Sequence, residues 1–286
     1  MAEIIQIGWR NYADGATLSG GSWVSTLPLT NLQRRPLSKI ARSTNALTTS
    51  TVISIDMGSS AAIVGKVMLW GHNISQSGTI QITAGTTAGD DDVYDSGSLS
   101  VWPALAPEDL EWEDDNWWFG TLSDTDVEGY PIRFSADCGD NITARYWKIQ
   151  ITDTSNPDGY IEAGRLWMGP FWAPTINYAP GAGLSWEPRS DEQMSRGGVL
   201  YFDQQASVRV FSFQLSAVTD VEAWGTLMEL QRIAGNAREV VVIPDPGDAQ
   251  YGHKRDILGR LRKSDALTIA DIDGWQTAGF EVEELL

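Results

Sequence analysis

The chain has 286 residues, of which 42% are hydrophobic and 20% charged, so it is long enough for two domains and too apolar to be intrinsically disordered. Its 38 acidic and 20 basic residues leave a formal charge of −18, which would repel a phosphate backbone and argues against nucleic acid as a partner. No run approaches the roughly 18 apolar residues of a membrane span, and the N-terminus lacks a secretory signal. We therefore expect a protein without a membrane span that is made in the cytosol.

Short β-branched runs, separated by Gly, Ser and Asn, predict strands in the first half of the chain. They are Val52–Met57, Ile63–Trp70, Thr79–Thr83, Arg145–Thr152 and Tyr160–Met168. Between the third and fourth runs, residues 88–129 are rich in Asp, Glu, Trp and Pro, and such a long segment is unusual in a compact domain. It predicts either a functional loop or a hairpin with a weak sequence signal.

Prolines and glycines interrupt the pattern between Pro170 and Pro180. This break predicts a boundary between a domain of residues 1–172 and a domain of residues 173–286. The second half opens with a long strand, Ser207–Ser216, whose apolar phase changes between Val210 and Phe211, as a bulge or burial on both faces requires. Further strands are predicted at Glu239–Ile243, Asp256–Arg262 and Ala278–Leu285.

One α-helix is predicted near residues 220–234. Thr219 and Glu222 match a capping box, and Gly235 ends the apolar pattern. The apolar stripe at helical spacing, which we expect to face the core, consists of Val221, Trp224, Leu227, Met228 and Ala234. The predicted fold class is therefore mainly β, with a single helix in the second domain.

The sequence contains no recognisable catalytic set, and we expect no enzyme activity and no cofactor. His72 and His253 lack the spacing of a metal site, and no GxSxG motif surrounds a serine. Cys138 is the only cysteine, which favours a small buried thiol over a reactive one. Gly247–Lys254 approaches a phosphate loop, but the lysine does not directly follow the second glycine, so a polar turn is favoured.

Three consecutive aspartates, Asp90, Asp91 and Asp92, are weak candidates for calcium ligands. Carboxylate oxygens suit Ca²⁺, yet the spaced ligands and the downstream bidentate Glu of a calcium loop are missing. A solvated loop is the favoured interpretation.

An aromatic segment provides the candidate binding residues, which are Trp102, Trp112, Trp117, Trp118 and Phe119. Carboxylates surround them, namely Glu108, Glu111, Glu113, Asp114 and Asp115. Three hypotheses stay open: the aromatics cover a sheet or a subunit interface, they bind a sugar, or the carboxylates cleave one. The first hypothesis is favoured, and hydrolysis ranks last.

The first half resembles a discoidin-type, galactose-binding-like jelly roll. The resemblance lies in VISIDMGSSAAIVGKVMLWGHN, TIQITAG and RYWKIQITDTSNPDGYIEAGRLWMGP, in that order, and spans about residues 1–172. It implies an N-terminal jelly-roll β-sandwich. It implies no ligand, because residues 85–129 depart from the family's loops.

The start of the chain, NYADGATLSGGSWVSTLPLTNLQRRPLSKIARS, is similar to bacteriophage virion proteins that carry such a jelly roll. The second half, with SVRVFSFQLS, DVEAWGTLMELQRIAG, VIPDP and HKRDILGRLRK, resembles the tube-like domain of siphophage distal tail proteins. The resemblance implies a C-terminal β-sandwich or tube-type domain and a virion protein of the tail tip, assembled in the bacterial cytoplasm. It also implies self-association into a ring, a hexamer or a trimer, with tail tube and tail hub or baseplate proteins as neighbours. The alternative is a carbohydrate-binding module that attaches the tail tip to a glycan of the host surface.

Overall fold

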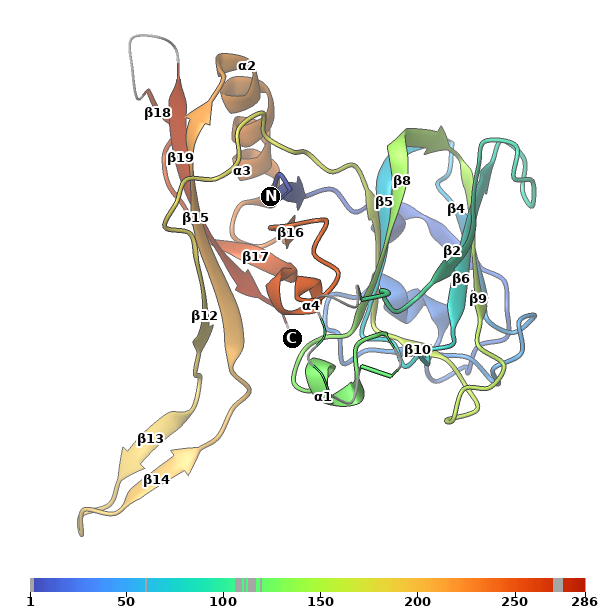
Figure 1. Cartoon of the computed structure of the whole chain (residues 1–286), viewed down its shortest axis with the longest axis horizontal. Helices are drawn as coiled ribbons and strands as arrows, with labels where there is room; N and C mark the ends of the chain where they lie inside the picture. The colour runs from blue at the N-terminus through green and yellow to red at the C-terminus, as the bar shows by residue number, and fades with distance from the viewer. Residues whose placement is uncertain are drawn as a thin grey trace. The chain divides into compact units, whose positions relative to one another are not determined.

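The computed structural model describes residues 3–59, 61–105, 110, 112, 117–118, 120–269 and 275–285. The chain forms two compact units. The jelly-roll unit consists of Arg10–Phe171 and Gly247–Lys254, and the sheet–helix unit consists of Met1–Trp9, Trp172–Pro246 and Arg255–Leu286. Strands dominate both units, which confirms the mainly β fold class (Figure 1).

The jelly-roll unit is a sandwich of two antiparallel sheets. In the described residues, the larger sheet has the order β2 (Thr17–Ser19), β4 (Val52–Asp56), β9 (Tyr146–Thr152), β6 (Thr79–Gly85) and β7 (Tyr94–Ser100). The smaller has the order β11 (Arg165–Gly169), β5 (Ala62–Trp70) and β8 (Arg133–Ala144). A two-stranded pair, β3 (Ala41–Arg42) with β10 (Glu162–Ala163), and the 3-10 turns η1 (Tyr12–Gly15) and η2 (Leu29–Gln33) complete the frame.

Alternation along the strands builds the core between the two sheets. In β9, Trp147, Ile149 and Ile151 are buried, whereas Lys148 is exposed on the outer face. Such alternation is what a sheet with one solvated face requires. The strands predicted in the first half are confirmed. Residues 88–129 contain the weakly signalled strand, β7, which pairs with β6 as a hairpin.

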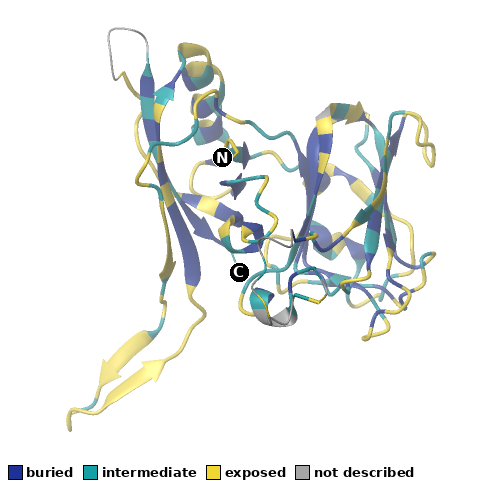
Figure 2. Cartoon of the chain, in the orientation of Figure 1, coloured by how far each residue is buried: buried dark blue, intermediate teal, exposed yellow. Residues whose placement is uncertain are grey.

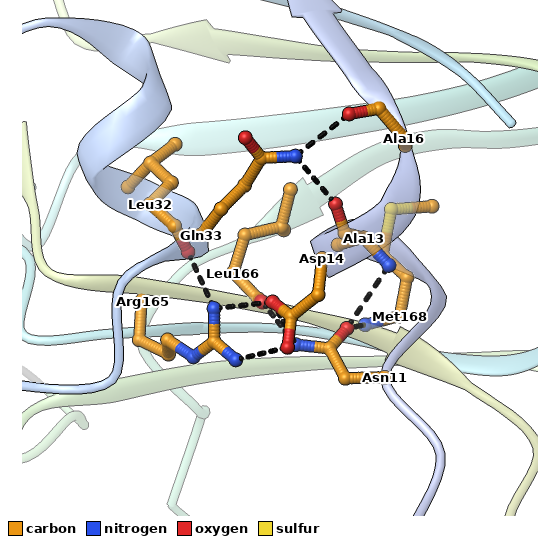
Figure 3. A network of polar contacts seen from close by, with 9 residues as sticks. All are labelled: Asn11, Ala13, Asp14, Ala16, Leu32, Gln33, Arg165, Leu166 and Met168. Carbon is orange, nitrogen blue, oxygen red and sulfur yellow. Dashed lines mark hydrogen bonds and ion pairs between the residues drawn. The ribbon is translucent and has the colours of Figure 1, made fainter.

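Polar side chains tie the beginning of the jelly-roll unit to its last strand (Figure 3). Asn11 donates through Nδ2 to the Leu166 carbonyl at 2.9 Å, and its Oδ1 accepts from the amides of Ala13 at 3.1 Å and Met168 at 3.0 Å. Gln33 donates to two carbonyls of the first turn, each at 2.7 Å. Because these bonds satisfy backbone groups of irregular segments, they fix the path of the N-terminal loop on the sandwich.

The sheet–helix unit contains one antiparallel sheet with a helical segment against it. Within the described part of the chain, the sheet has seven strands in the order β1 (Gln6–Gly8), β16 (Glu239–Ile243), β17 (Ile257–Ser264), β19 (Gln276–Glu284), β15 (Val208–Val218) and β12 (Gly183–Glu187), with β18 (Thr268–Ile269) beside β19. A separate hairpin, β13 (Asp191–Met194) with β14 (Leu200–Asp203), extends beyond β12 and β15 (Figure 1). None of the described helices is long and apolar enough to cross a membrane.

The helical segment occupies residues 220–234 as predicted, but another face is buried. It runs through α2 (Asp220–Glu222), the π-helical η4 (Ala223–Leu227) and α3 (Met228–Ala234). Thr219 and Glu222 form the capping box, and Gly235 follows with φ 51°. The buried stripe is Ala223, Leu227, Leu230 and Ala234. The prediction was wrong for Val221, Trp224 and Met228, which are exposed, because the smaller alanines allow a closer approach to the sheet.

The units differ from the predicted domains at two places. The first strand, β1, pairs with β16, so residues 1–9 belong to the sheet–helix unit and not to the jelly roll. Residues 247–254, which include most of the short helix α4 (Gly252–Arg255), belong to the jelly-roll unit. The reason in both cases is pairing between residues far apart in sequence, which a break in composition cannot reveal.

The change of phase in the long strand β15 reflects burial on both faces. Val208, Arg209, Val210 and Phe211 are all buried, and β12 and β19 flank the strand. The bulge lies later, between Leu215 and Val218. Arg209 is satisfied within this layer by Glu284, whose Oε2 accepts from its Nε at 3.0 Å.

Candidate functional site

The described residues on either side of the aromatic segment lie next to each other in the jelly-roll unit. The Leu105 amide donates to the Gly120 carbonyl at 2.8 Å, and Ala104 and Thr121 form an isolated bridge. Leu110 packs against the hydrophobic core. Residues 104–105 and 120–121, which flank the aromatic segment, are therefore held together by backbone contacts.

Within the aromatic segment the ring of Trp112 contacts two further indoles, and we call Trp112, Trp117 and Trp118 the tryptophan cluster. The ring centroids of Trp112 and Trp117 lie 5.2 Å apart at 67°, and those of Trp112 and Trp118 lie 6.4 Å apart at 56°. Trp112 is 67% exposed and Trp118 is 77% exposed, whereas Trp117 is half-buried. Large apolar surface that stays in water is unfavourable, so such a cluster is typical of a surface that a ligand or partner covers.

Trp102 lies apart from this cluster, in the core. It is 6% exposed, its Nε1 donates to the Ile74 carbonyl at 2.9 Å, and its ring meets the edge of His72 at a centroid distance of 6.5 Å. A buried indole with a satisfied N–H stabilises the fold and cannot meet a ligand. Phe119, Glu108, Glu111, Glu113, Asp114 and Asp115, which the sequence also singled out, lie outside the described residues.

The three consecutive aspartates form a loop and no metal site. Asp92 accepts hydrogen bonds from the Thr86 amide at 2.9 Å and from the Thr86 hydroxyl at 2.7 Å. The amide bond from Thr86 is the main reason that the pKa of Asp92 lies below its ordinary value. Asp90 and Asp91 are exposed. Among the residues that the structure describes, no group of three or more His, Cys, Asp or Glu side chains is placed to hold a metal ion.

The two histidines are both buried, which sets their pKa values. Burial lowers the pKa of His72 to about 4 and lowers the pKa of His253 as well. The His253 ring lies 3.0 Å, through Nε2, from the Asp126 carbonyl and meets the edge of Tyr130. These two contacts of His253 attach the segment Gly247–Lys254, which approached a phosphate loop in sequence, to the jelly-roll unit.

A polar groove on the outer face of the larger sheet was missed by the sequence. It encloses about 290 Å³. Its lining includes Thr17, Ser19, Ser54, Asp56, Tyr146 and Lys148 together with the loop residues Ala88, Gly89 and Asp90. The signal was present in the alternation of β9, whose outward positions are polar. What the sequence lacked was the order of the strands, which brings residues from β2, β4 and β9 together.

No protein-family model matches the chain, and no curated protein sequence does. Among solved structures, the chain is similar to the family 32 carbohydrate-binding module of Clostridium perfringens NanJ in complex with galactose, at 13% identity and a TM-score of 0.37, with 58% of this chain and 99% of that chain covered. A module from a family 31 glycoside hydrolase of the same organism is 14% identical, with 57% and 99% covered and a TM-score of 0.36. An F-lectin from striped bass (Morone saxatilis) serum is 10% identical, with 73% and 71% covered and a TM-score of 0.37.

Proposed function

We propose that the jelly-roll unit binds carbohydrate through the tryptophan cluster. The observation that carries the proposal is the contact of the exposed Trp112 ring with the half-buried Trp117 and with Trp118, which is itself largely exposed. The C–H faces of a sugar ring are apolar and flat, and they stack on an indole while the sugar hydroxyls keep their contacts with water. A saccharide would cover the exposed surface of Trp112 and Trp118.

We propose binding without cleavage. Hydrolysis of a glycosidic bond needs two carboxyl groups held at a separation of roughly 5 to 10 Å on opposite sides of the bond. The tryptophan cluster offers a stacking surface, which is the requirement for retention of a sugar and not for its hydrolysis. Release of new reducing ends from a bound polysaccharide would contradict this part of the proposal.

The test is a glycan array with the full chain, followed by titration of the best glycan. We expect Trp112→Ala and Trp118→Ala each to weaken binding about tenfold, since loss of an aromatic stacking partner removes apolar contact worth about 1 to 2 kcal/mol. Trp224→Ala is the matched control, because Trp224 is 53% exposed but lies on the helical segment of the sheet–helix unit. An array without hits, or unchanged affinity in both loop variants, would sink the proposal.

A second function is favoured by the hairpin of the sheet–helix unit. Its strands β13 and β14 are exposed throughout (Figure 2). The exposed side chains are apolar in large part: Met194 70%, Val199 55%, Leu200 50%, Tyr201 62% and Phe202 61%. Beside the hairpin in sequence, the edge strand β12 exposes Leu184 and Trp186. Apolar strands of this kind are sites for association with another chain.

We propose that these strands join copies of the chain into a ring, a trimer or a hexamer, in a phage tail tip. A contact between two different surfaces of identical subunits closes into a ring when the rotation permits. In this role the ring would lie between the tail tube and the hub or baseplate proteins, and the jelly-roll unit would present its sugar-binding surface to the host. The two proposed functions then belong to one particle.

Mass measurement in solution tests the ring. We expect a multiple of three chains for the native protein and a monomer for the double variant Leu200→Ser with Phe202→Ser. Val221→Ser is the control, because Val221 is 82% exposed on the helical segment and outside the hairpin. A native protein that stays monomeric at high concentration would contradict the ring, and absence of label from the tail tip in antibody-stained virions would contradict its location.

A further inference from the structure

The polar groove has a floor of two cross-strand rows. Register places Ser19 opposite Ser54 and Ser54 opposite Lys148, and it places Thr17 opposite Asp56 and Asp56 opposite Tyr146. Directly opposed side chains on one face of an antiparallel sheet lie about 5 Å apart. The floor is therefore a continuous patch of hydroxyl, carboxylate, ammonium and phenol groups from β2, β4 and β9.

An ion pair holds one end of this floor in place. Asp56 accepts from Arg145 Nε at 2.8 Å and Nη2 at 3.1 Å, and it also accepts from the Gly58 amide at 2.9 Å. The Arg145 guanidinium lies over the Tyr146 ring, 4.7 Å from its centroid. Bidentate pairing and stacking restrict both side chains, so Tyr146 is oriented before any ligand arrives.

The loop residues Ala88, Gly89 and Asp90 form the wall of the groove, and local hydrogen bonds restrain them as well. The loop after β6 is closed by the two bonds from Thr86 to Asp92 and by the Asp90 amide, which donates to the Thr87 carbonyl at 3.2 Å. Gly85 lies directly beneath this loop, because a Cβ there would stand 2.4 Å from the Asp90 carbonyl oxygen. A wall held by local hydrogen bonds loses little conformational entropy when a ligand binds.

Several polar side chains of the floor form no hydrogen bond or ion pair with other side chains among the described residues. Lys148 is exposed and has no ion pair or side-chain hydrogen bond within the described residues, and the same holds for the hydroxyls of Ser19, Ser54 and Tyr146. The charges cancel locally, since Asp56 is paired with Arg145 and Asp90 faces the same groove as Lys148. The floor therefore offers hydrogen-bonding groups beside the apolar side chains of Ile55 and Trp147, which also line the groove.

We propose that the polar groove is a second subsite for a neutral mono- or disaccharide. Its volume of about 290 Å³ is at the lower end for ligand pockets, which is the size of a small sugar and excludes a folded chain. Sugar hydroxyls match the free ammonium and hydroxyl groups, and the ring has Tyr146 as an aromatic neighbour. The inference rests on the proposed function of the jelly-roll unit and adds a second contact, so a long glycan could bind at two places and gain avidity.

The test is calorimetric titration of the full chain with galactose, N-acetylglucosamine and lactose, with glucuronic acid as a charged comparison. We expect about two sites per chain. Lys148→Met with Ser54→Val should remove one of them and leave the other. The matched control is Lys39→Met with Thr152→Val, since Lys39 is an exposed lysine elsewhere and Thr152 is exposed farther along β9.

The variants separate the two proposals. If Trp118→Ala abolishes all binding and the groove variant changes nothing, the groove is no subsite while the proposed function stands. If the groove variant abolishes all binding and Trp118→Ala changes nothing, the groove stands and the tryptophan cluster is not the site. A groove that takes glucuronic acid but no neutral sugar overturns the neutral-ligand inference, and a chain that takes up no sugar overturns both.

Discussion

The guanidinium of Arg165 is fully buried and lies 2.6 Å, through Nη1, from the carboxylate of Asp14, which is 43% exposed. A second bond joins Nη2 to Asp14 at 2.8 Å, and Nη1 also donates to the Leu32 carbonyl at 3.0 Å. The two members of the pair therefore differ. Arg165 is buried and needs the carboxylate of Asp14 to offset its charge, whereas Asp14 keeps access to water. Figure 3 shows the contact between them.

This inequality predicts that Asp14→Ala destabilises the protein more than Arg165→Met does. Loss of Asp14 leaves a buried positive charge without its partner, which costs about 3 to 5 kcal/mol, whereas loss of Arg165 leaves a carboxylate that water can solvate. Denaturant unfolding followed by tryptophan fluorescence measures both. Arg232→Ala is the control, because its pair with Glu229 is exposed and should contribute little to stability. Equal losses for the two variants would show that the carboxylate is not the main partner of Arg165.

Gly169→Ala should be strongly destabilising. A Cβ at this position would lie 2.0 Å from the Arg10 carbonyl oxygen, and this backbone atom cannot move aside as the end of a flexible side chain can. Gly183→Ala is the matched substitution, because nothing lies within 4 Å of a Cβ there. We expect a fall of the melting temperature by several degrees for the first variant and almost none for the second. A Gly169→Ala protein as stable as the Gly183→Ala protein would refute the close approach.

Stability should fall as the pH drops from about 6.5 to about 4, partly through His72. Burial lowers the pKa of its imidazole from 6.5 to about 4, and the Ile74 amide donates to Nδ1 at 3.3 Å, which favours the neutral ring. Between these values the unfolded chain binds a proton here and the folded chain does not, so the free energy of unfolding falls by up to about 3 kcal/mol. His72→Gln should flatten the slope in this window, measured by unfolding at several pH values. An unchanged slope would mean that other groups account for the dependence.

Trp102→Phe should lower stability and leave sugar affinity unchanged. The substitution removes the bond to the Ile74 carbonyl and part of a buried ring, so it leaves a buried acceptor without its donor at a cost of about 1 to 3 kcal/mol. The effect is the reverse of that expected for Trp118→Ala, which should weaken binding and preserve stability. A loss of sugar affinity in Trp102→Phe without a loss of stability would show that Trp102 belongs to the binding surface.

Much of the fold could be predicted from local patterns. Strands β4, β6 and β9 alternate between buried and more exposed positions, and the helical segment has a capping box and a glycine after its end. The buried helix face could not be predicted, since two apolar stripes satisfy the same spacing and only packing selects one. The hairpin β13–β14 was also missed, because its apolar residues make no pattern against a core.

The site was only partly predictable for a similar reason. The aromatic composition of the loop indicated a binding surface, but it could not separate Trp102, which is buried, from Trp112 and Trp118. The polar groove depends on the order of the strands. Thr17 and Tyr146 are 129 residues apart in sequence (146 minus 17), and they lie on β2 and β9, the two strands that flank β4. Contacts of such separation leave no trace in a local window.

The pairing of β1 with β16 has a consequence for synthesis. The first strand leaves the ribosome some 230 residues before its partner at Glu239–Ile243, and the whole sandwich is translated in between (239 minus 8). Apart from residues 247–254, the jelly-roll unit is therefore an insertion within another domain, and its two sheets can form while the host sheet still lacks most of its strands. Its two ends at Arg10 and Phe171 are the points at which such a module could be exchanged or removed, so the sheet–helix unit can be examined as a continuous chain once a short linker joins Trp9 to Trp172.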